Sequence, residues 1–174
     1  MTPPNNSSAE SAAASLFKAG KLSWLIATFF GCGRIRPGPG TWASAATVLL
    51  WLLISQAAGA RFQVLIALLL ACLAIALGIP AATRVARESG LADPSFVVID
   101  EVAGQMIALL AAPVRWKTLL AGFILFRAFD IVKPPPLRLL EKIPGGAGIM
   151  LDDVGAGLYA LFILQAALHF GWLR

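Results

Sequence analysis

Long uncharged stretches recur along this chain and predict an all-α, polytopic helical membrane protein. Residues 42–60, 62–83 and 154–173 are each long enough, as helices, to cross the hydrocarbon core of a bilayer, which takes about 20 residues. Residues 102–114 and 118–126 are also apolar but are separated by a cationic break. We therefore expect about five transmembrane helices, of which the third and fourth are short and form a hairpin.

The two short segments leave two arrangements open. A single broken crossing would put Asp100 and Glu101 on the opposite face of the membrane from Asp130. A hairpin that turns near residues 113–117 would bring these acids together, although each arm rises only about 20 Å against a core of roughly 30 Å. In the hairpin, the acids would sit at or just below the lipid headgroups, with local thinning of the bilayer or access to water.

The beginning of the chain differs in character from the rest. Residues 1–21 are rich in Ser, Ala, Asn and Pro and lack an apolar period, so we expect a flexible cytosolic tail before a single membrane domain at 22–174. The apolar run at 22–30 has the outline of a signal peptide. Because Arg34 and Arg36 follow at once, we interpret it as an interfacial or half-inserted helix.

Composition and charge narrow the choice of partners. The 174 residues are 59% hydrophobic and only 13% charged, a balance typical of a membrane protein. Cys32 and Cys72 are too few for a disulfide scaffold or a zinc site. The net charge of +5 fits contact with anionic lipids, and the basic residues are spread over membrane-proximal loops, so a nucleic-acid partner is not expected. The sequence leaves the oligomeric state open.

The distribution of cations predicts the orientation. With five spans, one face carries only Arg61, Arg115, Lys117 and Arg174, and the remaining ten of the fourteen Lys and Arg residues lie on the other. Cytoplasmic loops are enriched in Lys and Arg. We therefore expect the ten-cation face in the cytosol and the C-terminus outside.

Five carboxylates fall at helix ends on the predicted cytosolic face. They are Asp100, Glu101, Asp130, Asp152 and Asp153. Neighbouring carboxylates repel unless a cation joins them, and a hard divalent ion with oxygen ligands is the usual solution. Mg²⁺ is expected where a substrate adds phosphate oxygens. For each acid alone, the alternative is a helix cap or an ion pair with Arg127 or Lys133.

Two further features predict phosphate binding. Arg127, Asp130 and Lys133 share one helical stripe, which three prolines then end. Residues 31–41 are rich in glycine, so that backbone N–H groups can approach an anion at a helix N-terminus. The candidates here are Gly38, Gly40, Thr41 and Ser44, and Thr41 or Ser44 would cap the helix. The alternative is an ordinary Gly/Pro loop that binds no anion. The two nearby arginines favour anion binding, because cations beside lipid headgroups attract anions.

Four motifs in order resemble the bacterial phosphatidylglycerophosphatase A family over about residues 22–172. They are Pro39-Gly40-Thr41, Ile99-Asp100-Glu101-Val102-Ala103-Gly104, Phe126-Arg127 through Asp130 to Lys133-Pro134, and Asp152-Asp153-Val154-Gly155-Ala156-Gly157. The resemblance implies a multi-pass inner-membrane, magnesium-dependent phosphatase of phosphatidylglycerol biosynthesis. It would convert phosphatidylglycerophosphate to phosphatidylglycerol and inorganic phosphate. Arg36 and Ala43 stand where the family commonly has proline and glycine.

The residue types suggest a mechanism. The five carboxylates would hold one or two Mg²⁺ ions and so serve as the catalytic residues, while Arg127, Lys133 and the backbone from Gly38 to Thr41 would hold the phosphate. A covalent route through Thr41 or Ser44 is an alternative, although no base stands beside either. The sole histidine, His169, lies near the far end of the last span, which excludes histidine-based phosphatase chemistry.

Two other functions remain open. A small ion-binding or transport protein of the membrane would also need carboxylates, but it would place them near the middle of the bilayer and in inverted repeats, and no repeat is visible. A lipid phosphatase acting on another phosphomonoester, such as phosphatidic acid, would share the same residues.

Overall fold

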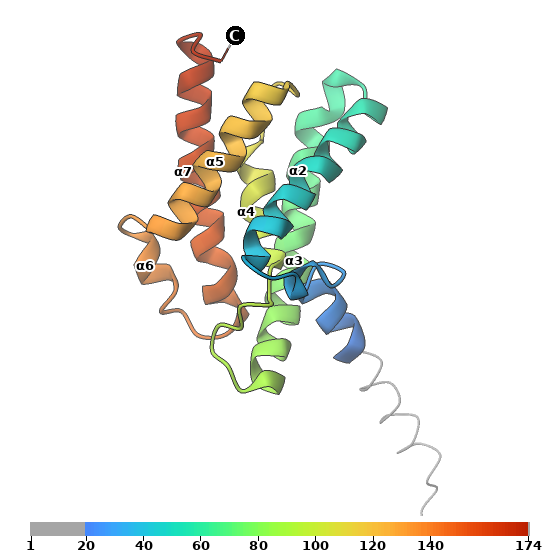
Figure 1. Cartoon of the computed structure of the whole chain (residues 1–174), viewed down its shortest axis with the longest axis vertical. Helices are drawn as coiled ribbons and strands as arrows, with labels where there is room; N and C mark the ends of the chain where they lie inside the picture. Colours follow the sequence, from blue (N-terminus) through green and yellow to red (C-terminus); the bar gives the residue numbers. More distant parts are fainter. Residues whose placement is uncertain (1–19, 174) are drawn as a thin grey trace, which may run out of the picture.

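The computed structural model describes residues 20–173, and within them the secondary structure is helical, as predicted (Figure 1). A helical segment at residues 20–27 is followed by η1 (Cys32–Arg34), α2 (Pro39–Ala57), η2 (Ala60–Phe62), α3 (Gln63–Ser89), α4 (Ile99–Ala108), α5 (Trp116–Val132), α6 (Leu137–Leu140) and α7 (Gly146–His169). The predicted flexible tail lies outside the described residues, except for residues 20 and 21, which belong to the first helical segment.

Three helical segments are long and apolar enough to cross a bilayer. They are Pro39–Ala57, Ala60–Ser89 and Gly146–His169, and they correspond to the first, second and last predicted spans. Leucines such as Leu65 and Leu69 are exposed on α3, which suits contact with lipid tails. With 10 and 17 residues, α4 and α5 rise only about 15 Å and 26 Å. The count of five spans therefore stays a prediction.

The two short helices form the hairpin rather than a single broken crossing. Arg127 is near the end of α5, and its NH1 lies 3.8 Å from Oε1 of Glu101, which is in the first turn of α4. The first turn of α4 and the last turns of α5 are thus at the same end of the molecule. α4 stops at Ala108, earlier than the predicted 114, because the chain turns through Ala111, whose φ is 57°, ahead of Pro113.

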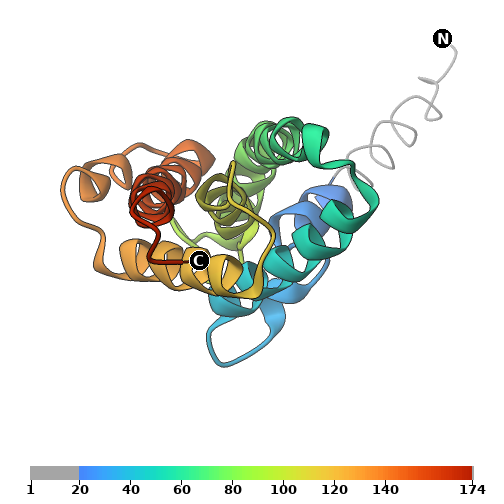
Figure 2. The same ribbon diagram turned by 90° about the horizontal axis from the view of Figure 1, so that it is seen from above.

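α4 is the centre of the fold. It contacts α2, α3, α5 and α7, which surround it when the molecule is seen from above (Figure 2). Nine of its ten residues are buried. It can approach α7 this closely only because Gly104 and Gly157 meet at the crossing, where a Cβ on Gly157 would lie 2.4 Å from the carbonyl oxygen of Gly104.

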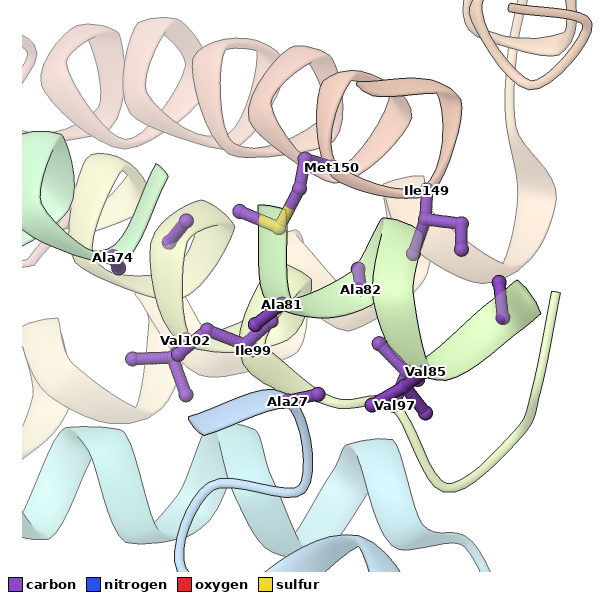
Figure 3. Packing of buried hydrophobic residues seen from close by; sticks show 12 residues of the cluster. Ala27, Ala74, Ala81, Ala82, Val85, Val97, Ile99, Val102, Ile149 and Met150 are labelled. Atoms are coloured by element: carbon purple, nitrogen blue, oxygen red, sulfur yellow. The ribbon is translucent and has the colours of Figure 1, made fainter. Parts of the chain in front are cut away.

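Small side chains hold α3 against α4 and α7. Figure 3 shows this cluster, in which alanines of α3 pack against larger side chains from the neighbouring helices. Its members include Ala74, Ala81, Ala82 and Val85 of α3, Ile99 and Val102 of α4, Met150 of α7, and Ala27 of the first helical segment. Helices in lipid associate through such close packing, since the lipid itself is apolar.

Two predictions about helix starts are wrong. Asp152 and Asp153 were expected before the last helix, but α7 begins at Gly146, so both lie inside it. Gly146 donates its N–H to Thr83 Oγ1 at 2.9 Å, which starts the helix against α3. α2 begins at Pro39 after Gly38 and has no side-chain cap. The hydroxyl of Ser44 instead donates to the carbonyl of Gly40 at 2.9 Å.

Candidate active site

A cavity of about 230 Å³ opens where the starts of α2 and α4 meet the end of α5 and the first turns of α7. We call it the acid cavity. Its lining includes all five predicted carboxylates, both predicted cations and two glycines of the predicted phosphate loop. These are Asp100, Glu101, Asp130, Asp152, Asp153, Arg127, Lys133, Gly38 and Gly40. Thr41 is exposed and Ser44 is buried in α2, and neither lines the cavity.

Three of the carboxylates form a group of their own. One oxygen each from Asp100, Glu101 and Asp153 lies within 4.8 Å of the other two. Each residue also has a buried oxygen that accepts no hydrogen bond from the described chain: Asp100 Oδ1, Glu101 Oε2 and Asp153 Oδ2. Unpartnered hard oxygens converging in this way fit a divalent cation such as Mg²⁺, which prefers carboxylate ligands.

The other two carboxylates are paired with cations. Asp130 Oδ2 lies 2.6 Å from Arg127 NH1, three residues earlier on α5. Asp152 Oδ2 accepts a hydrogen bond of 2.6 Å from Lys133 Nζ. The predicted set of five therefore divides into a group of three and two carboxylates with a cation at 2.6 Å, and Arg127 links the two sets because it also lies 3.8 Å from Glu101. All five line one cavity.

Lys133 is held by its surroundings. It ends α5 with a φ of 46°, and Arg138 donates to its carbonyl at 3.2 Å. Its Nζ contacts Glu141 as well as Asp152. Partial burial opposes the charge, but hydrogen bonds to these two carboxylates outweigh it and raise the pKa of Lys133 above its ordinary value. The ammonium therefore persists through neutral and moderately alkaline pH.

The first turn of α2 forms part of the cavity wall. A Cβ on Gly40 would lie 2.0 Å from Glu101 Oε1 and 3.0 Å from Arg127 NH1, so a larger residue would displace these two side chains. The first N–H groups of a helix have no intrahelical partner and favour anions. The predicted helix N-terminus thus lies beside both a carboxylate and a cation of the site.

Sequence reasoning missed part of the site. Asp93 and Ser95, from the loop after α3, also line the acid cavity, and Glu141 reaches Lys133. Asp93 and Glu141 are not among the five predicted carboxylates. Their position in the sequence could have identified Asp93 and Ser95. They flank Pro94 only a few residues before Asp100, so this short loop must lie beside the start of α4.

Cys32 lies outside the lining of the acid cavity. Burial, reinforced by the negative charge of Glu101, raises the pKa of its thiol, so the thiol stays protonated near neutral pH.

Known proteins match most of the chain. The family model for phosphatidylglycerophosphatase A matches residues 25–168. A Haemophilus influenzae protein named phosphatidylglycerophosphatase A is 40% identical over 144 residues, which cover 82% of this chain and 86% of the relative. The Escherichia coli protein of the same name is 33% identical over 147 residues, with 83% of each chain covered.

A third relative carries a different name. This Bacteroides thetaiotaomicron protein, whose name proposes a phosphatidylinositol-3-phosphatase activity, is 38% identical over 149 residues, 84% of this chain and 93% of its own. No solved structure is a significant match. The matches over more than four fifths of the chain, together with the four motifs gathered around one cavity, place the chain in the phosphatidylglycerophosphatase A family.

Proposed function

We propose that this phosphatase removes the terminal phosphate of phosphatidylglycerophosphate, giving phosphatidylglycerol and inorganic phosphate in phosphatidylglycerol biosynthesis. Two relatives named phosphatidylglycerophosphatase A support the substrate. The observation that carries the proposal is the acid cavity itself, where three carboxylates with unpartnered oxygens face Arg127 and Lys133. A divalent ion and a phosphate group together would satisfy both sets of charges.

In this proposal, Asp100, Glu101 and Asp153 hold Mg²⁺. When bound, the ion would stabilise negative charge on the phosphate and lower the pKa of a water molecule. Asp130 and Asp152, which we had predicted as further ligands, keep the Arg127 and Lys133 side chains against the cavity wall. They would therefore act as positioning residues.

The chain's own cations and backbone perform the rest of the proposed chemistry. Phosphate monoesters react through a loose transition state with charge on the peripheral oxygens, so neutralising that charge is the main task. Arg127, Lys133 and the first turn of α2 at Gly40 would do so. A water oxygen attacks the terminal phosphorus, the bond to the glycerol oxygen breaks, and that oxygen leaves as a hydroxyl after taking a proton.

A water nucleophile suits the site better than a covalent route. The Ser44 hydroxyl already donates to the Gly40 carbonyl, and the exposed Thr41 is not part of the cavity lining. A serine or threonine nucleophile needs a base within hydrogen-bonding reach. We therefore assign neither a covalent role nor a contact with the phosphate to Thr41 or Ser44.

We further propose that the acid cavity opens at the cytosolic surface of the bacterial inner membrane. The distribution of cations along the chain supports this orientation. Figure 1 shows the C-terminus at the end of the molecule opposite residues 20–34, so the C-terminus would lie outside.

The test is phosphate release by the purified protein in detergent micelles containing phosphatidylglycerophosphate and Mg²⁺. We expect turnover that a chelator abolishes. Asp100→Asn and Asp153→Asn should each lower it by roughly 100-fold or more, and Asp130→Asn by a smaller factor of roughly 10 to 100, with the fold intact. Arg87→Gln, on the exposed end of α3, is the control. Near-normal turnover in the Asp100 and Asp153 variants would refute the metal assignment.

The same assay separates the rival functions. The Bacteroides relative makes phosphatidylinositol 3-phosphate the second candidate substrate, and phosphatidic acid is the third. Comparing kcat/KM for the three lipids ranks them directly. An ion-binding or transport protein would release no phosphate from any of them.

A further inference from the structure

Three cavities adjoin one another along the side of the molecule formed by residues 20–40. The first, of about 990 Å³, is lined by Trp24, Leu25 and Phe30 among others, and we call it the apolar groove. The second, of about 490 Å³, contains Arg34 and Arg36, and we call it the arginine pocket. The third is the acid cavity.

Shared lining residues show that the three cavities are neighbours. Trp24 and Arg34 belong to both the apolar groove and the arginine pocket. Gly38, Pro39 and Ser95 belong to both the arginine pocket and the acid cavity. A single extended molecule could therefore occupy all three in sequence.

The apolar groove has the character of a site for hydrocarbon. Leu25 is 44% exposed and Phe30 is 74% exposed, both within or just after the helical segment that was predicted to lie in the membrane interface. Exposed apolar side chains beside basic ones are typical of segments that lie at the headgroup level. Lys21, Arg84 and Glu88 also line this groove, and Arg84 is paired with Glu88 at 2.7 Å.

The arginine pocket has the character of an anion site with firm walls. Arg34 and Arg36 are exposed, and no ion pair is found for either within residues 20–173. One wall is the stacked pair Trp24 and Phe96, whose ring centroids are 5.3 Å apart. The loop is fixed by Trp42, whose Nε1 donates to the Pro37 carbonyl at 3.1 Å. Guanidinium groups match phosphate oxygens in geometry and charge.

We propose that the arginine pocket binds the phosphodiester of the lipid whose terminal phosphomonoester lies in the acid cavity. The order of the cavities then follows the order of groups in such a lipid: acyl chains, phosphodiester, headgroup, phosphomonoester. Arg34 and Arg36 become specificity residues that select lipids with two phosphates over phosphatidic acid, which has only one. This inference rests on the proposed function.

Kinetics of Arg34→Gln, Arg36→Gln and the double variant test the proposal, with Arg87→Gln as a control of equal charge change. For phosphatidylglycerophosphate, each single variant should raise KM about tenfold and leave kcat within about twofold of the wild type. Arg34→Lys and Arg36→Lys, which keep the charge but lose the planar fork, should lie in between. Because both arginines are exposed, thermal unfolding should be unchanged.

Two inhibitors separate the diester from the monoester. Phosphatidylglycerol carries the diester alone, and its inhibition constant should rise with KM in the arginine variants. Glycerol 3-phosphate carries the monoester alone, and its inhibition constant should not change. A wild-type KM in the double variant, or an equal rise for glycerol 3-phosphate, would overturn the assignment. If the wild-type protein does not hydrolyse phosphatidylglycerophosphate at all, the proposed function itself fails.

Discussion

At the residue scale, the site divides its carboxylates by how close a cation lies. Asp130 and Asp152 each have a cationic partner at 2.6 Å, whereas Asp100, Glu101 and Asp153 face one another and have only the longer Glu101–Arg127 contact of 3.8 Å between them. Placing three like charges this close is costly unless a cation or protons neutralise them. Groups held in such surroundings are typical of functional sites.

The first prediction concerns this group of three. Mg²⁺ should raise the thermal unfolding temperature of the detergent-solubilised wild-type protein by roughly 5–10 °C at about 100 times its dissociation constant, since it binds only the folded site. Asp153→Asn should lose this shift. Without metal, the variant should be at least as stable as the wild type, because one of three repelling charges is gone.

Asp93→Asn serves as the matched control, because Asp93 lines the same cavity but lies outside the group of three. It should keep the Mg²⁺ shift. An equal shift in wild-type and Asp153→Asn protein would mean that the ion binds elsewhere, and the absence of a shift in the wild type would remove the metal site.

Sequence reasoning identified the acids but not their individual partners. The motif spacing shows that Asp100, Asp130 and Asp153 come from helices that can meet at one face. It does not show that Lys133 turns toward Asp152, because that contact depends on the turn after α5 and on the depth of Asp152 within α7. Tertiary packing decides which side chains pair across helices, and the spacing of residues along one helix carries no information about that packing.

At the element scale, the hydrophobic runs predicted the longer helices but not the four-residue α6, and the glycines misled the prediction of where helices begin. The run Pro144-Gly145-Gly146-Ala147-Gly148 has the composition of a flexible loop, yet Gly146 and Gly148 lie in the first turn of α7. A Cβ on Gly146 would lie 2.2 Å from the Ile79 carbonyl oxygen, so this glycine is there for close contact with α3. Between membrane helices, small residues more often mark contact than flexibility.

The second prediction concerns the crossing of α4 and α7. Gly157→Ala would place a Cβ 2.4 Å from the Gly104 carbonyl oxygen, which is backbone and cannot rotate away. The helices must separate, so we expect a loss of about 1–3 kcal/mol in the free energy of unfolding. Phosphate release should fall as well, because Asp100 and Asp153 are carried by these two helices. Thermal unfolding and the phosphate assay measure both effects.

Gly59→Ala is the control for this substitution. Gly59 lies between α2 and η2, has a φ of −59°, and has its nearest neighbour, a Phe62 ring carbon, 3.9 Å from the added Cβ. Stability and activity should therefore stay close to wild type. Equal losses in Gly59→Ala and Gly157→Ala, or none in either, would contradict a special role for the crossing.

At the scale of the whole molecule, the acid cavity, the arginine pocket and the apolar groove are neighbours that share lining residues. The three long apolar helices were predictable from composition and length alone. The central place of α4 was not, since a segment of 10 residues gives no sign that four other helices surround it.

The third prediction concerns orientation, tested by cysteine labelling. In a background of Cys32→Ser and Cys72→Ala, Trp172→Cys should react with a membrane-impermeant maleimide in intact cells. Lys142→Cys should react only after the membrane is permeabilised. Both positions are exposed, so access depends on the side of the membrane. The reverse pattern would invert the proposed topology and place the site outside the cytosol.

The late position of α7 in the chain has a consequence for biosynthesis. Asp152, Asp153 and Ile149 all come from this last helix, and Lys133 gains one of its two carboxylate partners there. A nascent chain that ends before residue 146 therefore has no acid cavity, however well its earlier helices insert. Synthesis of α7 thus sets the moment at which the site comes into being, and chains terminated before this helix would be unable to act on headgroups.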